Sequence, residues 1–342
     1  MPETLAVPRD RKGTSDFSPL ARQVRASGLM NRRTGYYSFS IAANVLATAA
    51  VWVAVAVMGD TWWQIALAVP AALLSTRTGF LGHDAGHLQI SRSARTGRLL
   101  GFLLGNLMIG MSHGWWIDKH NRHHANPNHV DKDPDVAAGA LVWTPEQTAE
   151  RQGLMLWAAR HQDRLFFPML LLEGLNLQVT SVLELRKRSP RVRAVEGTLL
   201  AVHAVGYLAL AFGLMSPLHA VVFILVHQGL FGLHLGSAFA PNHKGMPMPG
   251  PGERWDHLRR QVLTSRNVRG GPVTDWMLGG LNYQIEHHLF PSMPRPNLRK
   301  VQPLVREHCA LVGLPYAETG LVDSYSRSLR HLRTVGTASP AE

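Results

Sequence analysis

The sequence predicts an all-α integral membrane protein with four transmembrane helices in two hairpins, interfacial helices and a helical cap on the cytoplasmic side. Three observations predict this class. Four apolar stretches each approach the ~20 residues needed to cross the hydrocarbon core of a bilayer. They form two closely spaced pairs, and lysine and arginine are concentrated at one end of both pairs. Long polar segments separate the pairs, which argues against a purely soluble protein and against a transporter built almost wholly of spans.

The first predicted hairpin combines residues 39–58 with residues 65–81. The first stretch carries no charge, and aromatic pairs at 36–37 and 62–63 flank it as interfacial aromatic belts do. The second stretch follows after a short turn and carries Arg77 near its end, where a long side chain can reach the interface.

The second predicted hairpin combines residues 197–215 with residues 218–240, joined around Pro217. Two further apolar stretches, 99–111 and 166–183, are short, glycine-rich or interrupted by polar residues. If either one spanned the bilayer, successive histidine clusters would lie on opposite sides of the membrane. We therefore interpret both as interfacial or re-entrant segments.

Basic residues predict the orientation of the chain. Residues 1–37 contain seven lysines and arginines, residues 186–193 contain five, and the two hairpin turns contain none. The positive-inside rule then places both termini and the large polar segments in the cytoplasm of a multi-pass membrane protein. The seven basic residues of the N-terminal segment are Arg9, Arg11, Lys12, Arg22, Arg25, Arg32 and Arg33.

This pattern divides the chain into a basic N-terminal segment (1–37), a membrane domain (38–308) and a C-terminal tail (309–342). No secretory signal peptide is evident in the first 35 residues. The single cysteine, Cys309, excludes a disulfide framework, a thiolate iron–sulfur cluster and a multi-cysteine zinc site. Metal chemistry in this chain therefore depends on nitrogen and oxygen ligands, and 18 histidines supply the nitrogen.

Three short clusters concentrate these histidines, and all lie outside the spans on the predicted cytoplasmic side. Residues three or four apart on a helix share one face, so each cluster can direct at least two side chains to one place. A single pair of this kind is more often a solvated surface pair, but the ordered series HxxxH, HxxHH, QxxHH strongly favours metal binding. The clusters are His83 and His87; His120, His123 and His124; and Gln284, His287 and His288.

Seven imidazoles are too many for one closed four-ligand zinc site, and they suit two ions that keep open coordination positions. Nearby carboxylates can orient imidazole N–H groups from behind, and Asp84, Asp118 and Glu286 are the candidates. For Asp131, Asp133 and Asp135, a solvated acidic loop is an equal interpretation.

The clusters resemble those of the integral-membrane fatty acid desaturases, which share a histidine-rich di-iron site. The resemblance runs from about residue 37 to residue 308 and is strongest at 120–135 (HNRHHANPNHVDKDPD) and 275–295 (DWMLGGLNYQIEHHLFPSMPR). The QxxHH form of the third cluster, with TSRNV at 264–268, is similar to front-end and acyl-CoA desaturases.

The resemblance implies a set of iron ligands. The family also uses a histidine between the fourth span and the third cluster, and His243 in the sequence APNH is the best match. His227 and His234 compete for that role, although hydrogen-bonded histidines inside a span are the favoured interpretation of both. Gln284 is either a weak or water-mediated ligand or only a hydrogen-bonding residue, and His113, His129 and His203 are unassigned. The implied ligands are His83, His87, His120, His123, His124, His243, His287 and His288.

The function implied by the resemblance is an O2-dependent fatty acyl desaturase that inserts a cis double bond into an acyl-CoA or acyl-lipid. Two iron ions and O2 would be its cofactors. Roughly 36 residues precede the first span and no His-Pro-Gly-Gly haem motif is present, so electrons are expected from an external ferredoxin, flavoprotein reductase or free cytochrome b5. The net charge of +12 suits an acidic carrier and anionic lipid headgroups, and no nucleic acid partner is expected.

Two alternatives stay open at this point. A hydroxylase or related lipid oxidase can use the same di-iron scaffold. From another class, a membrane metal transporter or a bis-histidine haem protein also uses imidazole, but a transporter needs ligands inside its spans. Only His203, His219, His227 and His234 lie there.

Overall fold

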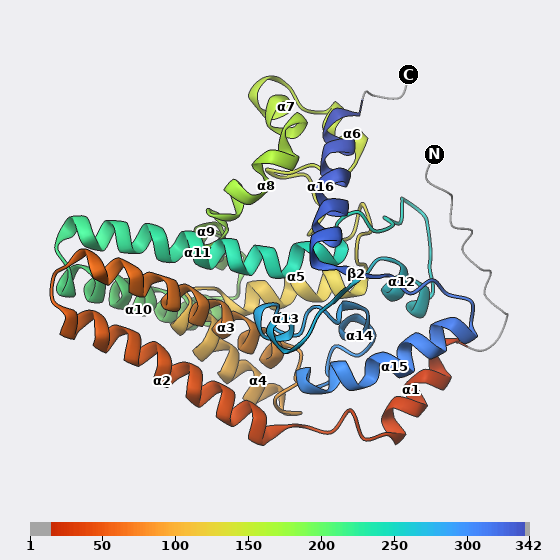
Figure 1. Cartoon of the computed structure of the whole chain (residues 1–342), viewed down its shortest axis with the longest axis horizontal. Coiled ribbons are helices and arrows are strands. Elements are labelled where there is room, and N and C mark those ends of the chain that lie inside the picture. The colour runs from red at the N-terminus through yellow and green to blue at the C-terminus, as the bar shows by residue number, and fades with distance from the viewer. Residues whose placement is uncertain (1–14, 339–342) are drawn as a thin grey trace.

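The computed structural model describes residues 15–338, so Arg9, Arg11 and Lys12 lie outside the described part of the chain. Within it the chain is mostly helical, and its two short strands form one parallel pair. The predicted all-α class is therefore confirmed. Figure 1 shows a bundle of long helices that continues into a cap of shorter helices, with a smaller lobe branching from its side.

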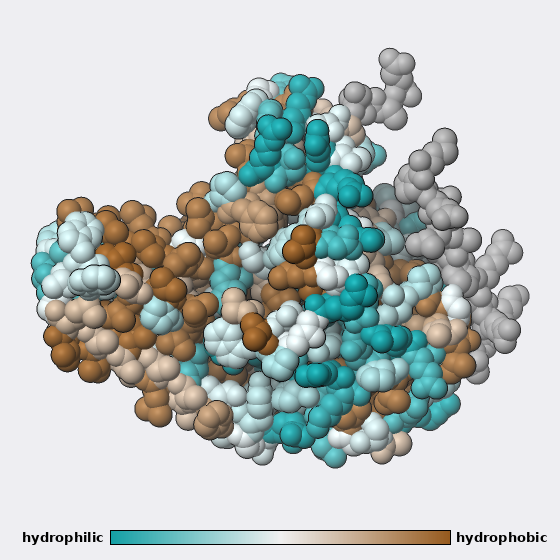
Figure 2. Space-filling model, in the orientation of Figure 1, coloured by the Kyte–Doolittle hydropathy of each residue, from teal (hydrophilic) through white to brown (hydrophobic). Residues whose placement is uncertain are grey.

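Four helices are long and apolar enough to cross a membrane, which confirms the four predicted spans. They form two hairpins and lie side by side in Figure 1, and their outer surfaces are largely apolar in Figure 2. The spans are α2 (Thr34–Met58), η1 (Trp62–Leu67) continuing into α3 (Ala68–Gly86), α10 (Pro190–Leu214) and α11 (Pro217–His243).

The inner pair of spans, α3 and α11, positions the functional groups. Half of the most apolar stretch of the span formed by η1 and α3 is buried inside the protein, against 11% of the corresponding stretch of α2 or α10. Polar contacts hold the outer helices in place, as where Asn44 Nδ2 on α2 donates to Thr78 Oγ1 on α3 at 2.7 Å. The histidines near the ends of α3 and α11 are thus carried by the two spans with the most protein around them.

The two segments interpreted as interfacial or re-entrant are broken helices. The first is α4 (Ala94–Gly101), which continues as the π-helical η2 (Phe102–Met108). The second is α8 (Gln162–Leu170), followed by a 73° bend into α9 (Glu173–Glu184) and the short η3 (Leu185–Lys187). If the bent pair were one span, the chain would have up to five.

A glycine on α11 explains how this bend fits against the bundle. A Cβ on Gly232 would lie 2.5 Å from Leu170 O and from Gly174 N, so only bare backbone allows α8 and α9 to approach this closely. The bend is therefore seated on α11 within the span.

The cap covers the ends of the spans and has its own apolar core, which includes Leu258, Ile285 and Met293. The strands β1 and β2 tie its distant parts together, with Asn267 opposite Glu318. The cap elements are α1 (Phe17–Ala26), α5 (His113–Ala125), α12 (His257–Leu263), β1 (Asn267–Arg269), α13 (Pro272–Met277), α14 (Gln284–Leu289), α15 (Arg295–Leu311) and β2 (Glu318–Gly320).

The lobe consists of α6 (Pro145–Ala149), α7 (Gly153–Arg160), α8 and α16 (Leu321–Thr337). The sequence predicts a tail from residue 309, but over 309–338 the structure has the end of α15, β2 and α16. The buried guanidinium of Arg266 explains this difference, because it donates to Ser324 Oγ on α16 at 2.8 Å and to Pro241 O near the end of α11 at 2.6 Å. Helix α16 is therefore bonded to the span that carries His243.

Candidate metal centre

Four elements deliver the eight candidate histidines to one place. His83 lies in the last turn of α3 and His87 directly follows that helix. Helix α5 carries the second cluster, α14 carries His287 and His288, and His243 is the last residue of α11. These four elements are far apart in the sequence. The cap holds α5 and α14 against the ends of the two inner spans, α3 and α11.

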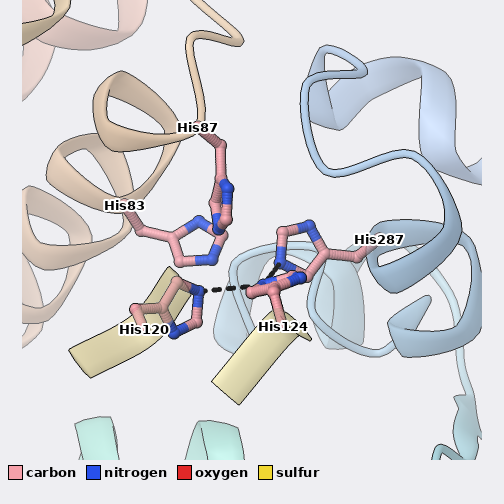
Figure 3. A group of neighbouring side chains, drawn as sticks. All are labelled: His83, His87, His120, His124 and His287. Atoms are coloured by element: carbon pink, nitrogen blue, oxygen red, sulfur yellow. Dashed lines mark hydrogen bonds between the residues drawn. The ribbon is translucent and has the colours of Figure 1, made fainter. Parts of the chain in front are cut away.

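The eight histidines form two groups, and within each group the ligand nitrogens lie within 4.8 Å of one another. Figure 3 shows the first group, whose rings point toward a common centre. The structure thus brings together all eight residues predicted as ligands. The five-histidine group is His83, His87, His120, His124 and His287; the three-histidine group is His123, His243 and His288.

Helical spacing explains how each cluster serves both groups. On α5, His120 and His124 are four residues apart and share a face, whereas His123 points to the neighbouring group. On α14 the adjacent His287 and His288 also divide between the groups. The two groups are neighbours, because the rings of His124 and His288 stack with their centroids 4.2 Å apart.

A buried ion pair orients His83 in the first group. The Asp84 carboxylate accepts from His83 Nδ1 at 3.2 Å, and its other oxygen pairs with Arg295 at 2.5 Å. Both His83 and Asp84 are buried. A carboxylate behind an imidazole fixes the ring orientation and leaves Nε2 directed forward, as is typical of metal-ligating histidines.

The three-histidine group is oriented in the same way, with an acceptor behind each ring. One acceptor is a carboxylate, one a backbone carbonyl and one a side-chain amide. With Nδ1 carrying the proton, each neutral ring presents the Nε2 lone pair to the centre of the group. The three bonds are each 2.9 Å: His123 Nδ1 to Asp133 Oδ2, His243 Nδ1 to Thr264 O, and His288 Nδ1 to Gln261 Oε1.

These Nε2 atoms fit a bound cation. His243 Nε2 and His288 Nε2 lie 3.0 Å apart although both rings donate through Nδ1, so two lone pairs face each other. In the first group, His83 Nε2 and His87 Nε2 are buried and have no hydrogen-bond partner among the described residues. One metal ion in each group would be bound by two of these four atoms. An all-imidazole set suits iron, copper, nickel or zinc rather than magnesium or calcium.

Burial keeps most of these rings in the neutral form that binds metals. Loss of solvent, with charge repulsion from neighbouring imidazoles, holds the pKa of five rings well below the usual histidine value. His123 differs: burial lowers its pKa, but the charge and hydrogen bond of Asp133 outweigh that effect and raise it. The five rings are those of His87, His120, His124, His287 and His288.

Two of the three predicted carboxylate partners lie elsewhere. Asp118 is largely exposed and pairs with Arg188 rather than with an imidazole. Glu286 is buried, but it accepts from Asn267 Nδ2 and Tyr316 OH, both at 2.7 Å, and burial raises its pKa to about 7. Asp118 lies on α5 and Glu286 on α14, the helices that also carry candidate ligands, but each side chain is on a face that does not point toward the histidine groups.

Asp133, for which the sequence left two interpretations open, is the carboxylate behind His123. The neighbouring Asp135 pairs with Lys119 at 2.6 Å and lies 3.5 Å from His123 Nδ1, whereas Asp131 is exposed. Gln284 donates from Nε2 to His243 Nε2 at 2.8 Å, so it lies at the edge of the three-histidine group.

The four other span histidines, His203, His219, His227 and His234, lie outside both groups. His227 is bonded to Ser75 Oγ at 3.0 Å and to Tyr207 OH at 2.7 Å. His234 Nε2 is 2.7 Å from Met277 O. Both competitors of His243 are therefore engaged in the hydrogen bonds expected of intramembrane histidines, and His203 and His219 are bonded to Leu107 O and to Asp60.

The model of the family described as Fatty acid desaturase matches residues 60–320 of this chain. The chain belongs to the fatty acid desaturase family. Two similar curated proteins are an acyl-lipid (9-3)-desaturase of Physcomitrium patens, 31% identical over 80% of this chain, and a Delta(6)-fatty-acid desaturase of Caenorhabditis elegans, 30% identical over 97%. A Delta(8)-fatty-acid desaturase of Helianthus annuus is 28% identical over 93%. These named relatives are oxidoreductases.

This desaturase chain spans 54% of the length of the moss relative and 77% of that of the nematode relative. The family match includes the three histidine clusters and His243, as well as three of the four spans in full.

Sequence reasoning missed several residues that support the desaturase histidines. Gln261 and the carbonyl of Thr264 hold two rings of the three-histidine group. Asn128, at φ 56°, adopts a left-handed conformation that asparagine tolerates, and it donates to His243 O at 3.0 Å and from its backbone N to Asp133 at 2.7 Å. Thr264 begins the TSRNV segment and Asn128 lies within the 120–135 segment that carries the resemblance, whereas no sequence signal pointed to Gln261.

Proposed function

We propose that this chain is an O2-dependent fatty acyl desaturase that inserts a cis double bond into the acyl chain of a CoA thioester or a lipid. The observation that carries the proposal is the pair of adjacent imidazole groups, in which eight ring nitrogens converge at two places and acceptors orient four of the rings from behind. Membership of the desaturase family and the names of the similar proteins support the same reaction.

The proposed metal site consists of two iron ions. The five-histidine group would hold one ion, and His123, His243 and His288 would hold the other, with Gln284 as a weak or water-mediated ligand. Bound iron with O2 supplies the oxidant that cleavage of an unactivated C–H bond requires. Three ligands in the second group leave coordination positions free for an exogenous molecule.

The protein's own contribution is orientation and exclusion of water. Asp84, Asp133 and Gln261 hold the rings from behind, so that each Nε2 stays aimed at its ion. Trp116 stacks on His120 with centroids 4.5 Å apart, and Phe239 lies 6.3 Å from His83. These aromatic surfaces offer apolar contact to an acyl chain beside the first group and so help to set which carbon is reached.

We further propose that both termini and the histidine groups face the cytoplasm. Arg32 and Arg33 precede α2, and residues 186–193 precede α10, at the same end of the bundle as the histidines. Electrons would come from an external ferredoxin, flavoprotein reductase or free cytochrome b5. The net charge of +12 favours association with an acidic carrier.

The test is expression in a microbial host whose membranes supply electrons, followed by gas chromatography–mass spectrometry of total fatty acids. We expect a new double bond at one of the positions named in the relatives, the fifth, sixth or eighth carbon. His288→Ala should abolish the product. His219→Ala, which changes a span histidine outside both groups, should retain it.

Metal analysis of the purified protein gives a second test. We expect two irons per chain and no haem absorption band. If the fatty acid products retained oxygen, the reaction would be hydroxylation and not desaturation. Persistent zinc without activity, or a haem spectrum, would overturn the di-iron assignment.

A further inference from the structure

The lobe carries large apolar side chains that no other part of the described chain covers. Three lie on α7, where Leu154 is 76% exposed, and others follow at the bend and on α9. The opposite side of α7 is packed, because Ala159 is buried and a Cβ on Gly336 of α16 would collide with its carbonyl. The exposed residues used here are Leu154, Met155, Trp157, Leu171, Leu172 and Leu175.

This apolar face is continuous with the surface of the spans. The bend between α8 and α9 is seated on Gly232 of α11, inside a span, and α9 packs along the same helix. Figure 2 shows apolar surface running from the span bundle onto the adjoining side of the lobe, while the other side is hydrophilic. Helix α8 contacts α11, and α7 lies beyond α8 at the tip of the lobe, which projects sideways from the bundle (Figure 1).

Charged residues of both signs lie beside this face, and Glu150, Asp163 and Glu173 are the acidic ones. Arg151 precedes α7, Arg160 ends it, and Arg164 lies in the first turn of α8. Trp157 stacks on His161 with ring centroids 4.7 Å apart. Tryptophan with leucine and methionine on one side and arginine at the edge is the composition of helices that lie in the headgroup region of a bilayer.

We propose that α7 and the α8–α9 bend form a lipid-binding surface, with its apolar side chains in the leaflet nearest the histidine groups. Lipid is the occupant because the face continues the apolar surface of the spans, through the bend seated on Gly232 and through α9 packed along α11. The lobe therefore lies along the membrane surface, and its hydrophilic side faces water. The inference is independent of the proposed reaction.

A single environment-sensitive fluorophore tests this surface. Cys309 is buried and is replaced by alanine, so that Leu154→Cys provides the only thiol for an NBD label. The labelled full chain is placed in nanodiscs of phosphatidylcholine and phosphatidylglycerol. The matched control is Ser326→Cys in the same background, at an exposed polar position on α16 of the same lobe.

We expect blue-shifted emission from the label at residue 154, with doxyl-labelled lipid quenching it several-fold more than aqueous iodide does. The control should show the reverse preference. Equal quenching by iodide at both positions would overturn the proposal. Blue-shifted emission that neither quencher reduces would also overturn it, because a second copy of the chain would then cover the face. Met155→Cys gives an independent second position if the first variant folds poorly.

Discussion

Replacing Asp133 by asparagine tests the support of the three-histidine group with the smallest change in shape. The Asp133 carboxylate is buried and accepts three hydrogen bonds: from His123 Nδ1 at 2.9 Å, from Asn128 N at 2.7 Å and from Asp135 N at 2.9 Å. Oδ2 receives the first two, and Oδ1 receives the third. Asparagine retains only one acceptor oxygen, so an NH2 group must face at least one of these donors.

The structure sets the expected magnitude. Asp133→Asn removes the negative charge behind His123 and at least one charge-assisted hydrogen bond, which contributes about 1.5–3 kcal/mol. If His123 is an iron ligand, this loss corresponds to roughly 10–100-fold weaker binding of one ion, the range typical of such supporting residues. The five-histidine group keeps its Asp84–Arg295 pair and should bind its ion as before.

The assay is iron per chain, measured by mass spectrometry after dialysis against a graded series of chelator concentrations. We expect the Asp133→Asn variant to lose one of two irons at a chelator concentration that leaves the unmodified protein fully loaded. Asp131→Asn is the matched control, because Asp131 is exposed in the same loop. If Asp133→Asn releases iron in parallel with the unmodified protein, the supporting role of Asp133 is wrong.

Two further predictions concern the packing that positions the site. Gly232→Ala should lower the free energy of unfolding by ~1–3 kcal/mol, because its Cβ would meet backbone atoms of α8 and α9. The thermal unfolding midpoint in detergent measures this, with Gly213→Ala, where a Cβ meets nothing within 4 Å, as control. Arg266→Lys should destabilise the contact between α16 and α11 by about 1–3 kcal/mol, because a single ammonium cannot make all the bonds of the buried guanidinium. Limited proteolysis should then cut near α16 sooner than in the exposed control Arg269→Lys, and equal rates would contradict this role.

The four spans and the residues that form the histidine groups could be predicted from the sequence alone. Spans can be recognised in a sequence because the length and hydrophobicity needed to cross a bilayer are local properties. The HxxxH and HxxHH spacings also indicate shared sites, because helical periodicity places residues three or four apart on one face. The mostly helical structure and the convergence of all eight histidines agree with these local signals.

How the histidines divide between the two groups, and which side chains orient them, became evident only from the tertiary structure. His123 and His124 are neighbours in the sequence but belong to different groups, because the rotation of α5 relative to α14 and α11 determines where each ring points. The same rotation turns Glu286 away from the centre, while the loop after α5 brings Asp133 behind His123. Nothing in the sequence indicated that α16 packs on the bundle, because its hydrogen bonds to α11 join residues 83 and 88 positions apart. Such contacts depend on the packing of elements that are distant in the chain, and no local pattern in the sequence records them.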